Sequence, residues 1–224
     1  QWTAHQRGGG TQGQARAAAE LRGDAVEWMA ATIAKLASPA PTLALATNPG
    51  VAVAAELLGP GLCYYLCAFA LPLLRPSQVH DPLAGSGRAD TLRTSSDAAI
   101  DPLQEDFVLR LIQRRMAATA GLPLENAEHL VVLRYRPGQE YRPHRDYLGP
   151  SALAAHRPEA GQRARTVCAY LNPVAGGGET EFPLRALRVP PRAGSAVVFD
   201  NLDADGQPAP ESLHAGLPVQ AGEK

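Results

Sequence analysis

The hydrophobic pattern of this chain changes period near residue 125, and this change restricts the possible folds more than any other feature. Before it, apolar residues recur every three or four positions, which predicts helices over 14–37 and 102–120. After it, apolar and polar residues alternate in short runs separated by Gly, Pro and polar turns, which predicts strands. Many short strands at roughly regular spacing are typical of a β-sandwich or jelly roll. We therefore expect an α+β fold with segregated helices and strands.

The expected strands are short, and each is bounded by turn residues. Past the change of period they cover 130–135, 139–146, 166–171, 187–189, 196–199 and 214–219. Upstream, short strands near 43–45 and 51–53 precede a buried helix over 62–74. Polar loops are expected over 81–91 and 147–162.

The chain is expected to divide near residue 41. Residues 1–41 form an N-terminal helical extension or linker, because the Gly-rich start and the helix end at a Ser-Pro-Ala-Pro segment. Residues 42–224 form the main domain. The helix could belong to an upstream domain or cap the following one, and the sequence leaves both possibilities open.

The charge of the chain argues against some kinds of binding partner, and its cysteine content favours one kind of cellular compartment. With 21 basic and 22 acidic residues, the 224-residue chain has a net charge of −1 and offers no basic field for nucleic acid or for a membrane surface. The longest apolar run, 62–74, is too short to span a bilayer. Three cysteines without zinc-ligand spacing favour a reducing compartment, hence a cytoplasmic location. The near absence of lysine favours a GC-rich, bacterial genome.

The sharpest local motif is a histidine and an aspartate two positions apart. On a strand, His144 and Asp146 project from the same face. His214, 70 residues later, is the candidate third ligand. Two histidines and one carboxylate bind iron(II) and leave three coordination positions open. The alternatives are a surface pair for the first two residues and a hydrogen-bonded histidine near a strand end for the third.

One further segment imitates a metal motif. Residues 201–206 resemble the start of a calcium loop, but Ser212 stands where the bidentate acid would be due and prolines interrupt the segment. We therefore interpret 201–206 as a polar turn before the last strand.

Four segments, taken in their order along the chain, contain or flank the candidate ligands. They are 133–147, the run from Gln162-Arg163 to Asn172, 177–183, and 212–224. In this order they resemble the catalytic domain of prolyl 4-hydroxylases, within the iron(II)/2-oxoglutarate-dependent dioxygenases. The resemblance covers residues 48–224 and is most specific from 130 onward. It implies a double-stranded β-helix, or jelly roll, with helices packed on one side and the N-terminal extension before it.

The resemblance also implies roles for eight residues, of three kinds. The implied iron ligands are His144, Asp146 and His214. The residues implied to hold 2-oxoglutarate, through an ion pair or a hydrogen bond, are Lys224, Tyr135 and Thr180. The residues implied to line a peptide groove are Tyr141 and Arg163. A buried dicarboxylate needs a cation, and the chain has only two lysines. Barrel packing remains the alternative for the tyrosines, and a solvated strand end for Arg163.

The implied activity is hydroxylation of a peptidyl proline with release of succinate and carbon dioxide. It would require iron(II), 2-oxoglutarate and oxygen, with ascorbate as a further candidate, and a peptide or protein substrate that could be proline-rich. No nucleic acid or membrane partner is expected, and the oligomeric state is open. The resemblance further implies a tryptophan-bearing strand after Lys224, so the last strand of the domain is expected to be truncated here.

Three alternatives remain at this point. The chain could hydroxylate another residue or a free amino acid, or be a non-catalytic jelly roll that binds a metal or ligand. A zinc hydrolase on a barrel is the third, but it leaves Lys224 and Thr180 without a role.

Overall fold

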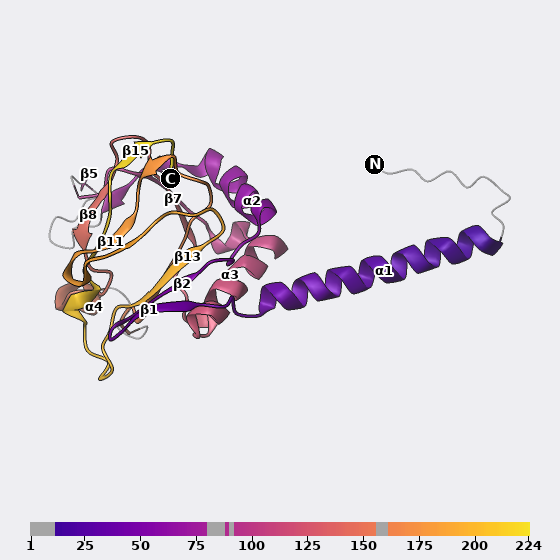
Figure 1. Cartoon of the computed structure of the whole chain (residues 1–224), viewed down its shortest axis with the longest axis horizontal. Coiled ribbons are helices and arrows are strands. Elements are labelled where there is room, and N and C mark those ends of the chain that lie inside the picture. The colour runs from indigo at the N-terminus through magenta and orange to yellow at the C-terminus, as the bar shows by residue number, and fades with distance from the viewer. Residues whose placement is uncertain (1–11, 80–87, 90–91, 156–160) are drawn as a thin grey trace.

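The computed structural model describes residues 12–79, 88–89, 92–155 and 161–224. Residues 1–11 of the expected extension and most of the predicted loop 81–91 lie outside the described residues. A long helix leads into a domain of antiparallel strands that carries two further helices on one side (Figure 1). The boundary placed between residues 41 and 42 stays a prediction.

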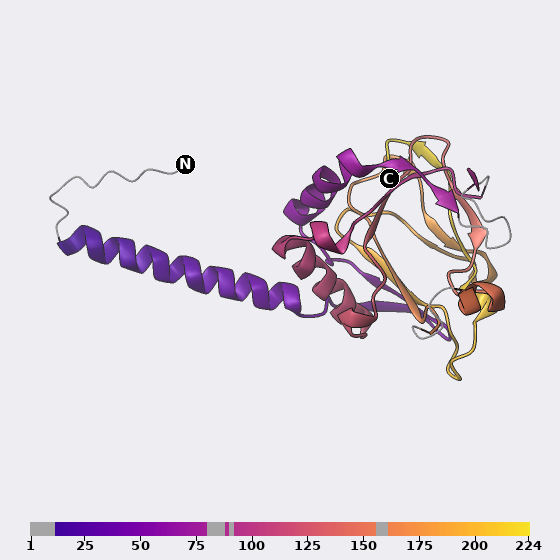
Figure 2. The same cartoon turned by 180° about the vertical axis from the view of Figure 1, so that it is seen from behind.

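Four α-helices are present among the described residues: α1 Gln12–Ala37, α2 Pro60–Ala70, α3 Phe107–Ala120 and α4 Pro150–Ala155. In both views α2 and α3 cover the same side of the strands (Figure 2). Leu66 of α2 and Ile112 of α3 share a buried apolar cluster with Ala54 and Ala196 of the strands, which holds this layer in place. None of the described helices is long and apolar enough to cross a bilayer.

Two predicted helices differ from expectation at their ends. The helix expected over 102–120 is divided into a 3₁₀ turn, Pro102–Gln104, and α3. Asp106 causes the break, because it is extended and its side chain accepts from the Leu109 N–H as the N-cap of a new helix. The helix expected over 62–74 begins at Pro60 and changes to a 3₁₀ turn over Leu71–Leu73, because a proline there cannot donate to the α-helical ladder.

The expected loop 147–162 also differs, since it contains α4. Shorter 3₁₀ turns occur at Leu124–Asn126, Pro183–Arg185 and Pro210–Ser212.

Two four-stranded antiparallel sheets form the body of the domain. The first has the order β1-β2-β13-β9 and the second β12-β11-β14-β8. Their strands are β1 Leu43–Thr47, β2 Gly50–Ala54, β9 Arg165–Ala169 and β13 Ala196–Asp200 in the first, and β8 Tyr141–His144, β11 Thr180–Phe182, β12 Leu187–Val189 and β14 His214–Gly216 in the second. Phe182 and Val189 of the second sheet pack against Val197 and Phe199 of the first. The architecture is the α+β jelly roll that the sequence predicts.

Three smaller antiparallel pairings accompany these two sheets among the described residues. They are the three-stranded sheet of β3 Arg75–Pro76, β6 Ser96–Ala99 and β7 Val131–Arg134, and the pairs β4 Gln78–Val79 with β5 Arg88–Ala89 and β10 Gly176–Gly177 with β15 Val219–Ala221.

The strand expected over 214–219 is therefore divided into β14 and β15. Pro218 lies between them and cannot donate to a strand ladder. Gly177 of β10 is required where this strand pairs with β15, because its φ is +72° and a Cβ there would lie 2.3 Å from the Pro218 carbonyl oxygen.

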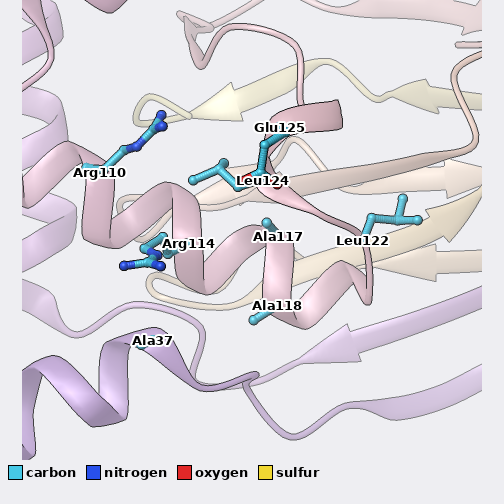
Figure 3. Close-up of a pocket in the computed structure, with 8 residues that line it drawn as sticks. All are labelled: Ala37, Arg110, Arg114, Ala117, Ala118, Leu122, Leu124 and Glu125. Carbon is cyan, nitrogen blue, oxygen red and sulfur yellow. The ribbon is translucent and has the colours of Figure 1, made fainter. Parts of the chain in front are cut away.

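Arg115 joins the C-terminal end of α1 to the domain. This α3 residue is 6% exposed and donates to four backbone carbonyls, those of Lys35, Ser38, Glu56 and Leu57. Beside this junction, Figure 3 shows a groove between Ala37 of α1 and the α3 surface, and the exposed Arg114 is one of the residues that line it. A buried guanidinium thus satisfies carbonyls that no regular element pairs.

We expect Arg115→Met to lower the free energy of unfolding by about 2–4 kcal/mol, because one buried and three partly buried hydrogen bonds lose their charged donor. Urea denaturation monitored by circular dichroism measures this loss. Arg114→Met is the matched control, since Arg114 is the exposed neighbour on the same helix and should change stability by less than about 0.5 kcal/mol. Equal losses for both variants would contradict the assignment.

Candidate metal centre

The three candidate ligands come from two neighbouring strands. His144 ends β8, Asp146 follows two residues later, and His214 begins β14. The antiparallel register places His214 directly opposite His144, although they are far apart in sequence. One ligand atom of each of the three residues lies within 4.8 Å of the others. The structure therefore brings together the three side chains that the sequence pointed to.

Backbone carbonyls orient both imidazoles. The Nδ1 of His144 lies 2.8 Å from the Arg142 carbonyl oxygen, and that of His214 lies 3.0 Å from the Ser212 carbonyl oxygen. These contacts favour the Nδ1–H tautomer, so each Nε2 keeps its lone pair. The Nε2 atoms lie 3.4 and 3.7 Å from Asp146 Oδ1, respectively. Two neutral nitrogens and one carboxylate oxygen facing a common point fit a divalent metal such as iron(II).

Aromatic rings enclose the two histidines. The Tyr141 ring stacks on His144 with centroids 3.4 Å apart and an interplanar angle of 15°. The Phe199 ring centroid lies 4.5 Å from that of His214, which is buried. This packing limits rotation of both imidazoles and keeps water from one side of the site.

The charges of the ligands suit a cation. Burial opposes ionisation of Asp146, but the contact with His144, the positive charge that His214 carries when protonated, and the Thr166 hydroxyl outweigh it and lower its pKa to about 2. Burial lowers the pKa of His214, with Asp146 acting in the opposite direction. At neutral pH the site therefore combines an ionised carboxylate with a neutral His214, the protonation states that metal ligation requires.

Lys224 lies inside the same domain, fixed through its backbone. Its N–H donates to the Tyr135 carbonyl at 2.9 Å, and the Tyr135 N–H donates back to its carbonyl at 2.7 Å. Its Nζ lies 5.5 Å from the Tyr135 ring centroid and 5.4 Å from that of Tyr170. Burial lowers the pKa of this ammonium, with the charges of Cys168 and Glu179 opposing it, and no ion pair within 4.0 Å joins it to a carboxylate in the described part of the chain. Such a site favours an anionic ligand.

Tyr170, a residue that the sequence analysis missed, connects Thr180 with the surroundings of this lysine. The Tyr170 hydroxyl donates to Thr180 Oγ1 at 2.8 Å, and both side chains are buried. The Tyr135 and Tyr170 rings thus lie near Lys224, and Tyr170 links this position to Thr180. The roles of Tyr135 and Thr180 toward a co-substrate stay predictions. Cys168 of β9 was also missed: burial raises the pKa of its thiol, with the Lys224 charge opposing this and the Asp146 charge adding to it.

The two residues expected to line a peptide groove both lie next to the metal ligands. Tyr141 stacks on His144, as described above. Arg163 makes a double hydrogen bond to the Glu128 carboxylate and donates to the Asp146 carbonyl at 3.2 Å. Their role toward a substrate stays a prediction. The groove of Figure 3 is lined by none of the eight candidate residues.

Thr166 and Asn201 were missed as well. Thr166 donates to Asp146 Oδ2 at 2.7 Å, and the Asn201 amide donates to Thr166 Oγ1 at 2.9 Å. Asn201 lies in the segment interpreted as a polar turn, yet it is fully buried. No local sequence signal identifies either residue, because both hydrogen bonds join segments that are distant in the chain.

Comparison with known proteins gives consistent results. Residues 130–224 match the family model of the 2OG-Fe(II) oxygenase superfamily. Prolyl 4-hydroxylase 1 of Arabidopsis thaliana is 36% identical over 191 residues, which cover 79% of this chain and 66% of the relative. Probable prolyl 4-hydroxylase 3 of the same plant is 32% identical over 202 residues, covering 82% and 69%. The chain thus spans about two thirds of the length of these curated relatives.

Solved structures agree with these relatives. The viral collagen prolyl hydroxylase vCPH from Paramecium Bursaria Chlorella virus-1, crystallised as a 2OG complex, aligns with a TM-score of 0.59 and 27% identity, covering 78% of this chain and 91% of that one. A Pseudomonas putida prolyl-4-hydroxylase aligns with a TM-score of 0.53 and 25% identity, covering 80% and 90%.

We expect the chain to bind one divalent metal ion, and His214→Ala or Asp146→Ala to abolish tight binding because each removes one of three ligands. Isothermal titration calorimetry with iron(II) under anaerobic conditions measures this. At a free metal concentration of 100 times Kd, the wild type should gain about 2.7 kcal/mol of stability.

His129→Ala serves as the control for loss of a histidine, because His129 is exposed and outside the cluster. If the triad variants kept wild-type affinity, or if the control lost it, the metal centre would lie elsewhere.

Proposed function

This chain belongs to the prolyl 4-hydroxylase family of the 2OG-Fe(II) oxygenase superfamily, and from this premise we propose that it hydroxylates proline in a peptide or protein. The reaction would use iron(II), 2-oxoglutarate and oxygen, and ascorbate is a candidate for keeping the iron reduced. One observation carries the proposal: a set of two histidines and one carboxylate shares the interior of a jelly roll with a buried ammonium.

The metal triad has a defined role in this proposal. His144 and His214 through Nε2, and Asp146 through Oδ1, would hold iron(II) on one face and leave the opposite positions open. Bound iron supplies the oxidation chemistry, in which 2-oxoglutarate is converted to succinate and carbon dioxide while one oxygen atom is inserted into a substrate C–H bond. The protein contributes ligation, orientation and exclusion of water.

Lys224 is proposed to bind the distal carboxylate of 2-oxoglutarate. A buried ammonium without an ion-pair partner among the described residues is stabilised by a bound anion. Tyr135 and Thr180 would add hydrogen bonds at the same end, and Tyr170 would orient Thr180. The keto acid end would then reach the metal, which fixes the direction of the co-substrate in the interior.

We expect Lys224→Met to raise the KM for 2-oxoglutarate by at least about 30-fold, which corresponds to the loss of a buried charge pair of about 2 kcal/mol or more. Steady-state assays of succinate release measure the change. Lys35→Met is a matched control, because Lys35 is the only other lysine in the chain and is exposed on α1. An unchanged KM in Lys224→Met would refute the assignment of this residue.

Tyr141 and Arg163 are proposed to contact the peptide. Both lie beside the metal ligands, and the Arg163 guanidinium is half-exposed. A proline-rich segment is the proposed substrate, since an extended chain of this kind enters a binding groove at a low cost in conformational entropy. We also propose a cytoplasmic location and a bacterial source, which the three free cysteines and the scarcity of lysine support.

The substrate assignment is tested by comparing three additions to the iron- and 2-oxoglutarate-loaded protein: a proline-rich peptide, the same peptide with every proline replaced by alanine, and free proline. We expect only the first to stimulate succinate release and to gain oxygen on proline by mass spectrometry. Turnover with free proline alone would instead support hydroxylation of a free amino acid. Equal turnover with the alanine peptide would support a different target residue.

A further inference from the structure

We propose that Thr166 and Asn201 are positioning residues that hold the Asp146 carboxylate in one orientation for metal binding. The inference rests on the proposed metal site and extends it to two side chains outside the ligand set. Neither residue would touch the metal or the substrate, and each would act through Asp146.

The two residues come from neighbouring parts of the first sheet, one on a strand and the other just after the adjacent strand. Thr166 is in β9, opposite Phe199 of β13, and Asn201 directly follows β13. The backbone of Asn201 is fixed on both sides, because its N–H donates to the Ala164 carbonyl and its carbonyl accepts from the Ala209 N–H, both at 2.9 Å. The amide therefore reaches Thr166 from a rigid position.

The hydrogen bonds form a chain with a single direction. A threonine hydroxyl has one proton, and the Asn201 amide donates to Thr166 Oγ1 at 2.9 Å. The hydroxyl proton is then left for Asp146 Oδ2, which lies 2.7 Å away. An ionised carboxylate can only accept, so a donor of fixed direction suits it.

This contact determines which carboxylate oxygen faces the metal. Because Oδ2 is held by Thr166, Oδ1 is the oxygen that lies 3.4 Å from His144 Nε2 and 3.7 Å from His214 Nε2. Without the hydroxyl, the carboxylate could rotate about its terminal bond and present either oxygen. Hydrogen bonds to ligating carboxylates orient them in metal sites generally.

The burial of Asn201 argues against a purely structural role for its side chain. Asn201 is 0% exposed, yet its Oδ1 has no hydrogen-bond partner among the described residues. An unsatisfied buried carbonyl destabilises a fold, and an apolar side chain of similar size would avoid that penalty. The amide is therefore best explained by what its Nδ2 does for Thr166 and Asp146.

The first test uses Thr166→Val, which keeps the side-chain shape and removes the hydroxyl. The apoprotein is titrated with cobalt(II) as a metal probe, and binding is followed by the visible absorption of the cobalt. We expect the metal affinity to fall by about 10–100-fold. Thr166→Ser restores the donor and should stay within about 3-fold of the wild type. Thr47→Val is the control, because it makes the same change at an exposed residue of β1.

The second test uses Asn201→Leu and separates positioning from stability. We expect the cobalt(II) affinity to fall by at least about 3-fold, while the melting temperature of the apoprotein is unchanged or higher. A structural role would give the opposite pattern, a lower melting temperature with wild-type affinity, and would overturn the inference.

The outcomes also distinguish this inference from the proposed function. Wild-type affinity in Thr166→Val, or failure of Thr166→Ser to recover it, would overturn the positioning role and leave the metal centre intact. A wild-type protein that binds no cobalt(II) or iron(II) at all would overturn both.

Discussion

The antiparallel pairing of β14 with β8 is the constraint on which the rest of the site depends. It sets His214 opposite His144 and so closes a ligand set from segments 70 residues apart. Because side chains alternate along a strand, a shift of one residue would turn His214 to the other face and leave Asp146 with a single imidazole. The rings of Tyr141 and Phe199 then hold the two histidines in the orientation that this register provides.

The interior of the domain is electrically asymmetric. One group combines a carboxylate with two imidazoles, and the Lys224 ammonium lies near the Tyr135 and Tyr170 rings. A metal dication at the first group and an anionic group at the lysine would each relieve a buried charge. A small diacid with a metal-chelating end would satisfy both needs at once, as the proposed function requires.

The sequence predicted the three candidate ligands that the structure brings together, but not the two residues that we propose to orient Asp146. The spacing of His144 and Asp146 suggested two candidate ligands, the alternation after residue 125 predicted the strands of the jelly roll, and the family resemblance added the prediction for Lys224. Thr166 and Asn201 could not be found, because strand pairing alone brings them to Asp146. The break at Asp106 was missed for a local reason: Asp101 and Asp106 both cap well, and the sequence pattern favoured Asp101 as the start of the helix.

The most direct test of this account is an anaerobic absorption titration of the protein with iron(II) and 2-oxoglutarate, followed in the visible range. We predict a metal-to-ligand charge-transfer band that needs both additions and disappears in Asp146→Ala, because it reports a keto acid chelated to iron held by the triad. A folded protein that binds iron(II) and 2-oxoglutarate without such a band would contradict the shared site.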